Sequence, residues 1–400
     1  MTDGPGSADN SSTRRPKDRR LIVAREAAEM FSAHGFAAVR MDDIARAVGV
    51  TARALYRHYP GKHDLLLAVA LAAQDNYYTA LAAADTTGDA RHRFRSAIAA
   101  LVEVTLDGRS HAVLWQREAR HLHAEQRALV RGRLTEIAHR IAELIGRCRD
   151  RPADDPTVEL LAWAVLSVVT SPGHHTRTLP RPDSDQLLIQ VADALAQLEL
   201  PPRSEDTGSI CTRPLSSRRE RIIQESARLF AERGYPAVSV EDIGEAAGIL
   251  GPSVYHYFPS KQQILHTLIH RVYEWMTFGL VTAVQTGEPK EAVVRMTDFY
   301  VSFALRFPDL TGIAVTEALY LGEAEAETLR RIRFEFVTEW ADLLTTSRPE
   351  ISPSTAAQII EVVLALVDDL ARTPHIHSAG IAGQMNTLAG AVVSASPTAV

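Results

Sequence analysis

The chain has 400 residues, a formal net charge of −6 and an ordinary hydrophobic share of 46 %. This length favours two or three domains, and the abundance of Ala and Leu over β-branched residues favours an all-α fold. Cys148 and Cys211 are too few for a disulfide framework or a zinc motif. The N-terminus is polar and no apolar run reaches about 18 residues, so neither a signal peptide nor a membrane helix is expected. We expect a soluble protein in a reducing cytoplasm.

Positive charge is concentrated near the N-terminus. Between residues 14 and 64, 11 Lys and Arg oppose 6 Asp and Glu, a local net charge of +5. Residues 1–16 have the composition of a disordered basic arm. A basic cluster at one end of an acidic chain is typical of a protein that contacts nucleic acid.

Residues 17–62 predict a small three-helix head. Apolar residues at helical spacing indicate a first helix over 19–34, which Gly35 ends. A second helix over 42–48 ends at Gly49. A third helix follows at once, so the head has the plan of a helix-turn-helix.

The third helix of this head is expected over residues 52–59. Thr51 can cap it by accepting a backbone N–H, and Lys62 then opens a long helix rich in Leu and Ala. In a helix-turn-helix, the second helix of the pair enters the major groove with its N-terminal residues toward the bases. The pattern therefore favours DNA binding.

The chain repeats itself at an offset of 199 residues, which aligns Gly35 with Gly234 over about fifty positions without a gap. The identical pairs include Phe31 and Phe230, Asp43 and Asp242, Gly49 and Gly248, Tyr56 and Tyr255, Pro60 and Pro259, and Lys62 and Lys261. The Pro- and Ser-rich residues 200–217 read as a linker between the two halves. The expected second head is therefore residues 218–261.

The second head follows the same plan with different caps. Ser239 and Asp242 form a capping box, where the first head has Arg40 at the cap position. Leu250 replaces the Thr cap of the third helix. Because Pro252 suits a first helical turn, that helix is expected to begin one residue later than its counterpart.

The stretches TARALYRHYPGK (51–62) and GPSVYHYFPSK (251–261) resemble the recognition-helix signature of the TetR family. The resemblance implies an all-α fold of two units, each a three-helix DNA-binding head followed by a helical ligand-binding and dimerisation domain. It implies phosphate contacts by Thr51, Tyr56, His58, Lys62, Tyr255, Tyr257 and Lys261. It implies base-facing positions at Ala52, Arg53, Ala54, Gly251, Pro252 and Ser253, with Arg40 near the duplex.

Three stretches resemble a narrower group within that family. They are RRPKDR (14–19), TARALYRHY (51–59) and VLWQREARHL (113–122), together with the tandem arrangement itself. These are similar to the tandem TetR-type repressors of actinobacterial mammalian-cell-entry lipid-transport operons. Repression, rather than activation, is implied by this resemblance alone.

The two heads are unlike. Residues 218–265 contain six basic and six acidic residues, so the second head has no net charge. Because phosphate contact supplies most non-specific affinity, the first head is expected to grip DNA more strongly. Arg53 is the only cation at the predicted base-facing positions of the two recognition helices, and arginine side chains commonly hydrogen-bond guanine. Two different recognition helices predict two different half-sites, and therefore a non-palindromic operator.

Residues 63–199 and 262–396 predict two helical regulatory domains. Each ends in an apolar helix pair, 156–170 with 184–198 and 354–371 with 379–394. The simplest arrangement packs one pair on the other within one chain, giving an intramolecular pseudo-dimer that is a monomer in solution. A dimer of tandem chains is the less favoured alternative.

A hydrophobic effector, such as a lipid, sterol or acyl thioester, is expected between heads and helix pairs. Most aromatic residues there are expected to be core, and a few to line an elongated apolar cavity. The candidate ligand-binding residues are Trp115, Arg117, Trp275, Phe299, Phe303 and Phe334.

No nucleophile elbow, phosphate loop or metal-binding spacing is present in the sequence, so no catalysis, cofactor or metal is expected. The alternative to a repressor is a lipid-sensing interaction protein in which only the first head contacts DNA. An enzyme is a distant third reading.

Overall fold

The computed structural model describes residues 16–109, 114–175, 177–202, 216–285 and 287–395. These residues fold into helices joined by short turns, and no strand occurs among them. Residues 1–15 of the expected arm and 203–215 of the expected linker lie outside the described residues. None of the helices in the described ranges is long and apolar enough to cross a membrane.

The first unit contains a head of three helices and a regulatory domain. The head is α1 (Pro16–Ala38), α2 (Met41–Val48) and α3 (Ala52–His58). The domain is α4 (Lys62–Ala83), α5 (Ala90–Asp107), α7 (Leu114–Glu118), η1 (Ala119–His121), α8 (Ala124–Arg149), α9 (Pro156–Thr170), η2 (Ser171–Gly173) and α10 (Asp183–Ala196).

The second unit repeats this order. Its head is α11 (Arg218–Arg233), η3 (Tyr235–Ala237), α12 (Val240–Ala246) and α13 (Gly251–Val254). Its domain is α14 (Lys261–Val284), α15 (Pro289–Arg306), α16 (Pro308–Thr316), η4 (Ala318–Tyr320), α17 (Glu323–Ser347), α18 (Pro353–Ala371), η5 (Pro374–Ile376) and α19 (Ile381–Ser394). The first residues of α4, α5, α8 and η1 lie 199 positions before those of α14, α15, α17 and η4, so the repeat extends far beyond the heads.

Local sequence explains the breaks in the first head. Gly35 has φ 77° and ψ 154°, which interrupts α1 as expected, because glycine adopts positive φ without steric cost. Gly49 ends α2 in the left-handed conformation at φ 72°. The buried side chains of Phe31, Ile44 and Leu55 hold the three helices together. Burying each such side chain contributes roughly 1.5–3 kcal/mol.

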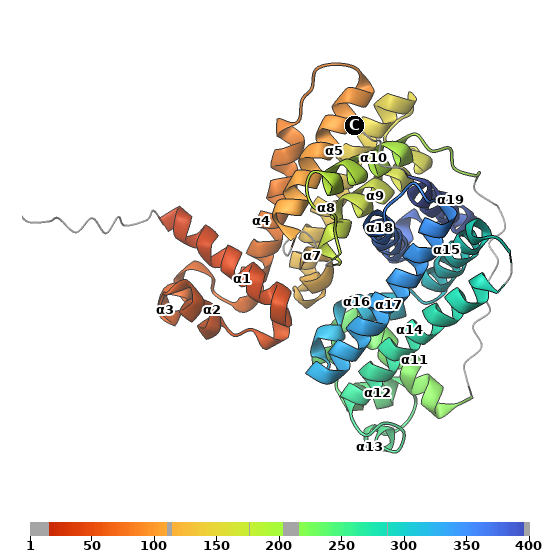
Figure 1. Ribbon diagram of the computed structural model, residues 1–400. Coiled ribbons are helices and arrows are strands. Elements are labelled where there is room, and N and C mark those ends of the chain that lie inside the picture. Colours follow the sequence, from red (N-terminus) through yellow and green to blue (C-terminus); the bar gives the residue numbers. More distant parts are fainter. Residues whose placement is uncertain (1–15, 110–113, 176, 203–215, 286, 396–400) are drawn as a thin grey trace, which may run out of the picture.

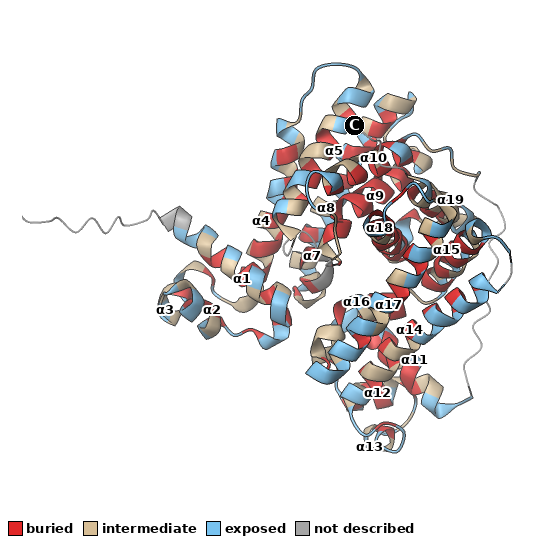
Figure 2. Ribbon diagram, viewed as in Figure 1, coloured by how far each residue is buried: buried red, intermediate tan, exposed pale blue. Residues whose placement is uncertain are grey.

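The two units pack through α9 and α10 of the first against α18 and α19 of the second. Helices α9 and α18 are buried on almost every face, because each lies between its own domain and the opposite unit (Figure 2). Gln358 on α18 adds a polar link: its side chain accepts from the Leu179 amide (2.7 Å) and donates to Ser184 (2.9 Å). The predicted pairing of the C-terminal helices within one chain is confirmed.

Candidate nucleic-acid interface

The turn between α2 and α3 presents the first recognition helix. The Thr51 hydroxyl accepts the Ala54 backbone N–H at 3.2 Å, as the sequence predicts for an N-cap. Leu55 is fully buried beneath this helix and anchors it. Tyr59, also buried, donates from its hydroxyl to the Arg20 carbonyl (3.1 Å). One face of α3 is thereby fixed to the head and the other is left to solvent.

The predicted base-facing residues occupy that free face. Arg53 is exposed, and Ala52 and Ala54 are half-buried beside it. Tyr56 is also exposed, and His58 is half-buried at the end of the helix. This helix therefore carries one long cation between two small side chains, which leaves room for a close approach to base edges.

Arg40 stands at the N-cap of α2, as expected. Its backbone N–H donates to the Asp43 carboxylate at 3.3 Å, while the side chain remains exposed. Arg46, which the sequence analysis did not single out, is exposed on the same helix and pairs with Asp43 at 3.1 Å. Its exposure could have been inferred from the apolar spacing of Ile44 and Ala45, which are buried.

The lysines at the start of α4 and α14 have backbone partners within their own heads. The Lys62 ammonium donates to the Ala37 carbonyl (3.2 Å) and lies 4.3 Å from the centre of the Phe36 ring. Lys261 donates to the carbonyls of Tyr235 (2.9 Å) and Val238 (2.7 Å). Burial lowers the pKa of both lysines. Each ammonium is half-buried against its own head, where it donates to backbone carbonyls a few residues before the second helix.

The second recognition helix is shorter than the first. It spans only Gly251–Val254 and begins in register with Ala52, so the expected shift by one residue is wrong. Its N-cap, Leu250, is 77 % exposed and provides no side-chain cap. Without that cap and with Gly and Pro in the first turn, the helix gives way to turns after four residues.

Two glycines bring the helices of the second head unusually close. A methyl group at Gly244 would lie 2.8 Å from the Gly251 backbone, so α12 and α13 meet backbone to backbone. Pro252 is exposed and Ser253 half-buried on this short helix, and Tyr255 and Tyr257 are exposed in the turns after it. The expected capping box is present: the Asp242 amide donates to the Ser239 hydroxyl at 3.0 Å.

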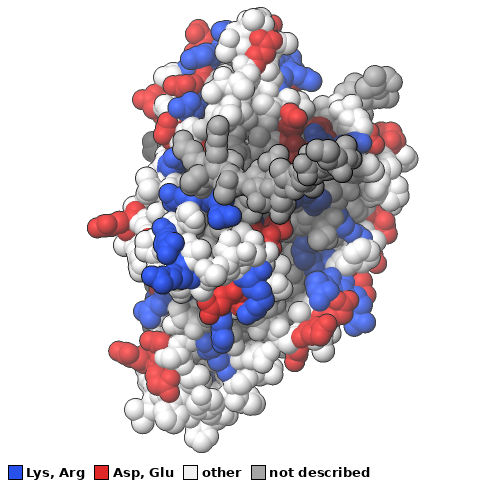
Figure 3. Space-filling view, turned by 90° about the vertical axis from the view of Figure 1, so that its left-hand side faces the viewer, with Lys and Arg blue, Asp and Glu red and all other residues white. Residues whose placement is uncertain are grey.

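Equivalent positions carry different charges in the two heads. Arg40 corresponds to Ser239, and Arg53 to Pro252. Arg46 corresponds to Glu245, and both are exposed. Figure 3 faces the side of the first head, where Lys and Arg are interspersed with Asp and Glu among the described residues. The positive balance of this head is therefore spread over single side chains rather than collected in one continuous patch on this face.

The six candidate ligand-binding residues do not line one cavity. Trp115 is buried against Tyr77, with ring centres 5.3 Å apart, and the Arg117 side chain lies outside the described residues. Phe303 is buried and packs against Trp275 at 5.5 Å. These rings pack against neighbouring aromatic rings, and their role in binding a ligand stays a prediction.

The remaining two candidates also have structural contacts. Phe299 lies so close to Gly279 that a methyl group there would overlap its ring. Phe334 is 55 % exposed, and the Arg177 guanidinium of the first unit lies 3.6 Å from its ring centre. Phe334 therefore belongs to the contact between units.

An open pocket of about 370 Å³ lies elsewhere, between α14 and α17. It is lined by His270, Tyr273, Glu274, Thr277, Phe278, Val281 and Ile332. The corresponding seam of the first unit is filled. Tyr78 donates to the Arg133 carbonyl (2.9 Å), and Arg133 pairs with Asp75. At those positions the second unit has Thr277 for Tyr78 and Ile332 for Arg133, so the space stays open.

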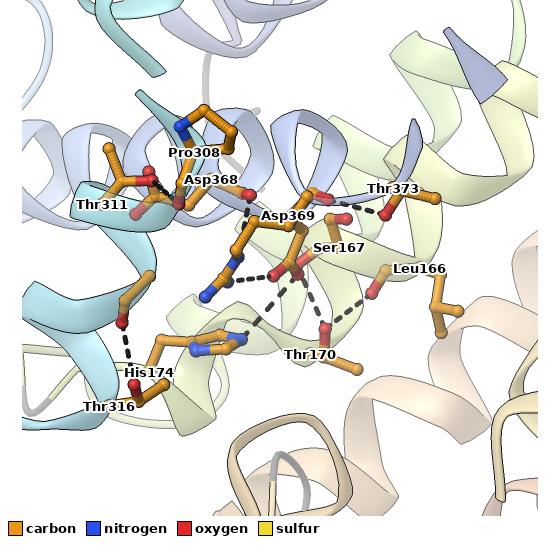
Figure 4. Close-up of polar contacts among 12 residues, drawn as sticks. Leu166, Ser167, Thr170, His174, Pro308, Thr311, Thr316, Asp368, Asp369 and Thr373 are labelled. Carbon is orange, nitrogen blue, oxygen red and sulfur yellow. Dashed lines mark hydrogen bonds and ion pairs between the residues drawn. The ribbon is translucent and has the colours of Figure 1, made fainter. Parts of the chain in front are cut away.

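A buried polar cluster occupies the contact between the units (Figure 4). His174 of the first unit points toward Asp369 on α18, with Nε2 and Oδ2 3.8 Å apart. His175 is buried, and its two ring nitrogens have no hydrogen-bond partner among the described residues. Burial lowers the His175 pKa to about 4, so this ring is neutral at pH 7. The cluster packs polar groups at the domain contact and contains no part of the heads.

Comparison with known proteins agrees with this geometry. The profile of bacterial regulatory proteins of the tetR family matches residues 24–69 and again 222–268. A tetracyclin repressor-like C-terminal domain matches residues 87–174. The two tetR matches coincide with the two heads, and the third lies within the first regulatory domain.

Curated relatives and solved structures include members of the same family. The transcriptional repressor KstR2 of Mycolicibacterium smegmatis is 42 % identical over 64 residues, 16 % of this chain and 31 % of that protein. The regulator EthR of the same organism is 30 % identical over 144 residues, covering 35 % of this chain and 66 % of EthR. The chain thus spans about a third of the length of the KstR2 proteins it matches.

Among solved structures, a tetR-family regulatory protein from Rhodococcus RHA1 is 26 % identical, with a TM-score of 0.39. It covers 44 % of this chain and 95 % of its own, which is the size of one unit. The chain belongs to the tetR family of bacterial regulatory proteins and carries the family's DNA-binding module twice.

Proposed function

We propose that this protein is a transcriptional repressor that reads a non-palindromic operator with two unlike heads. The observation that carries the proposal is the difference between equivalent exposed positions, Arg53 in the first recognition helix and Pro252 in the second. An arginine can donate two hydrogen bonds to guanine, whereas a proline side chain can only make apolar contact. Two such helices on one chain favour two different half-sites.

The first head supplies most of the affinity in this proposal. Its exposed cations include Arg40, Arg46 and Arg53 on or next to α2 and α3, whereas Glu245 stands at the position of Arg46 in the second head. Each phosphate contact by a cation releases condensed counterions, which strengthens binding at low salt. The second head then adds selectivity, with Ser253 and Tyr255 available for polar contacts and Pro252 for apolar contact with a thymine methyl group.

The effector in this proposal is an apolar small molecule that binds the second unit. The pocket between α14 and α17 supports this site, because Tyr273, Phe278 and Val281 give it apolar walls. The equivalent seam of the first unit is closed by Tyr78 and Arg133. Binding can release DNA only if the effector has a higher affinity for a state in which the heads no longer match the half-sites.

Regulation of a lipid-transport operon remains a proposal from the sequence resemblance. The relative named as the transcriptional repressor KstR2, matched over 64 residues, supports repression only. That the protein is a monomer in solution is likewise a proposal. Its support is that α9 and α10 pair with α18 and α19 within one chain, so the helices expected to pair are already paired.

A second candidate function has its own support. In it, only the first head contacts DNA, and the second head docks a partner protein. The four-residue α13 and exposed Leu250 favour this reading. Tyr255→Ala, with Tyr56→Ala as the matched change in the first head, separates the two. If both heads read DNA, each substitution lowers affinity for the full operator; if one does, only Tyr56→Ala lowers it.

Selection of bound duplexes from a random library by the purified full-length chain tests the main proposal. Two unlike half-sites in the enriched sequences are the expected result. Their centres should lie about 34–36 Å apart or more along the duplex. A palindrome, or a single half-site, would contradict reading by two unlike heads.

A further inference from the structure

Each head is held on its own regulatory domain by a buried glutamate. Glu118 accepts the Phe36 backbone N–H at 3.4 Å, and Glu317 accepts the Tyr235 backbone N–H at 3.0 Å. The two glutamates are separated by the repeat offset of 199, as are the two amides, and both glutamates are 0 % exposed. The aromatic rings add a second matched contact: Phe36 stacks on His121 and Tyr235 on Tyr320. The contact between head and regulatory domain is therefore the same in both units: a buried glutamate on a backbone amide and one pair of stacked rings.

The heads also touch the opposite unit. Gly35 of the first head lies against Leu319 and Tyr320 of the second unit, since a methyl group there would come within 2.8 Å of Leu319 Cδ1. Gly234 of the second head lies against His121 and Arg120 of the first, with the corresponding distance to His121 Cε1 at 2.7 Å. Both glycines are buried and have positive φ, 77° and 80°. Next to the contact with its own regulatory domain, each head therefore also packs against the opposite unit.

One of these crossed contacts is charged and its counterpart is apolar. Arg120 pairs with Glu317, and its Nη1 donates to the Thr316 hydroxyl at 3.0 Å. The Arg120 side chain is only 13 % exposed. Leu319 occupies the equivalent place in the second unit and cannot form an ion pair with Glu118. The buried ion pair therefore joins the first unit to Glu317, the residue that holds the second head, whereas Leu319 brings no charge toward the first head.

We propose that Arg120 is a positioning residue that fixes the separation of the two recognition helices. It acts through Glu317, which holds the Tyr235 amide at the point where α11 turns into the second helix-turn-helix. The inference rests on the proposed function, in which both heads meet one duplex. As a consequence, the protein discriminates between operators by the spacing of their half-sites. A head with a fixed position cannot move to reach a half-site at a different spacing.

The first head meets the second unit through a different side chain at the equivalent position. Glu118 holds the Phe36 amide, and Leu319 packs against Gly35. A charge-assisted bond to a buried carboxylate is directional, whereas apolar packing tolerates sliding. Loss of Arg120 should therefore free the second head more than any change at Leu319 frees the first.

Spin labels at Arg57→Cys and His256→Cys test the proposal directly. These exposed positions are equivalent, one beside each recognition helix, and Cys148→Ala and Cys211→Ala remove the natural thiols. Pulsed dipolar spectroscopy of the full chain should give a narrow distance distribution. Arg120→Leu, which introduces the residue the second unit already has, should widen it about twofold, and Leu319→Ala should change it less.

A double substitution separates loss of the link from the cost of a stranded buried charge. Arg120→Leu alone leaves Glu317 without its cation, which by itself can destabilise the fold. Arg120→Leu with Glu317→Gln removes both charges and keeps an acceptor for the Tyr235 amide. The double variant should fold and still show the widened distribution. A distribution as narrow as that of the parent in this variant would overturn the proposal.

Binding to duplexes with two half-sites at varied spacing provides the functional readout. The parent should prefer one spacing about tenfold, and the double variant should lose most of that preference while keeping its affinity for the first half-site alone. An unchanged preference in the double variant would also overturn the proposal. Failure of the parent to bind any two-site duplex would instead refute the proposed function, and the distance measurement would still decide the role of Arg120.

Discussion

Tyr300 on α15 donates a hydrogen bond from its hydroxyl to the Asp368 carboxylate on α18, at 2.8 Å, deep in the second unit. Both side chains are buried. Burial raises the Asp368 pKa to about 6, and it raises the Tyr300 pKa well above its usual value. A carboxyl group that resists ionisation in the folded state makes the stability of this unit depend on pH.

Stability should therefore fall as pH rises through about 6. The folded-state pKa of Asp368 lies above its ordinary value of 3.8, so its contribution is fully present below about pH 4 and is lost as pH rises through about 6. A shift of this size corresponds to roughly 2–3 kcal/mol. Asp368→Asn keeps a hydrogen-bond partner for Tyr300 and removes the titration. Urea unfolding at pH 4.5 and 7.5 should show a smaller pH difference in the variant than in the parent, and equal differences would contradict this assignment.

Arg53→Ala should relax base specificity in the first half-site. If Arg53 bonds a guanine, its loss costs about 1–3 kcal/mol at one base pair and little elsewhere. Competition binding against every single-base variant of the selected operator measures this. Arg57→Ala is the matched control, because Arg57 is exposed on the same helix but outside the predicted base-facing positions. A uniform loss over all sequences in Arg53→Ala would mean that this side chain contacts phosphate instead.

Glu245→Arg should strengthen DNA binding by the second head. The position corresponds to Arg46 and is exposed. Glu245 forms no ion pair with the described residues, so the substitution adds a cation without breaking an ion pair. One added phosphate contact should steepen the dependence of log K on log salt by about 0.9. The reciprocal Arg46→Glu should reduce that slope in the first head. No change of slope in either variant would place these residues away from the duplex.

Gly244→Ala should disable the second head selectively. Its methyl group would collide with the Gly251 backbone and force α13 away from α12. Affinity for the second half-site should fall more than about tenfold while the first half-site is bound as before. Gly132→Ala is the matched control: its methyl group meets no atom within 4 Å, and it should stabilise α8 by about 0.5–1 kcal/mol. Normal binding to the second half-site by Gly244→Ala would refute this role of the close approach.

Thr277→Tyr with Ile332→Arg should close the pocket of the second unit. These are the residues that fill the same seam in the first unit, where Tyr78 bonds the Arg133 carbonyl. Fluorescence of the neutral apolar dye Nile red should rise on binding to the parent and fall to background in the variant. Tyr78→Thr with Arg133→Ile, the reverse exchange, should create new binding in the first unit. Equal dye binding by the parent and the closed variant would exclude this pocket as the site.

The sequence by itself determined the helices, their caps and the repeat. The Thr51 cap, the Ser239–Asp242 capping box and the Gly49 turn depend on groups within three or four residues of one another, so their partners can be read along the chain. The pairing of the C-terminal helices followed from their apolar character, because two such helix pairs in one chain must bury each other.

Only the tertiary structure decided which side chains remain free and where space is left. The ammonium groups of Lys62 and Lys261 donate to carbonyls more than twenty residues away, a contact that no local pattern predicted. The aromatic residues predicted to line a cavity pack on one another, and the pocket lies where the first unit has a tyrosine and an arginine. The Arg120–Glu317 ion pair joins residues 197 positions apart. Contacts of this kind depend on how two helices meet in space, and no local pattern of residues records that meeting.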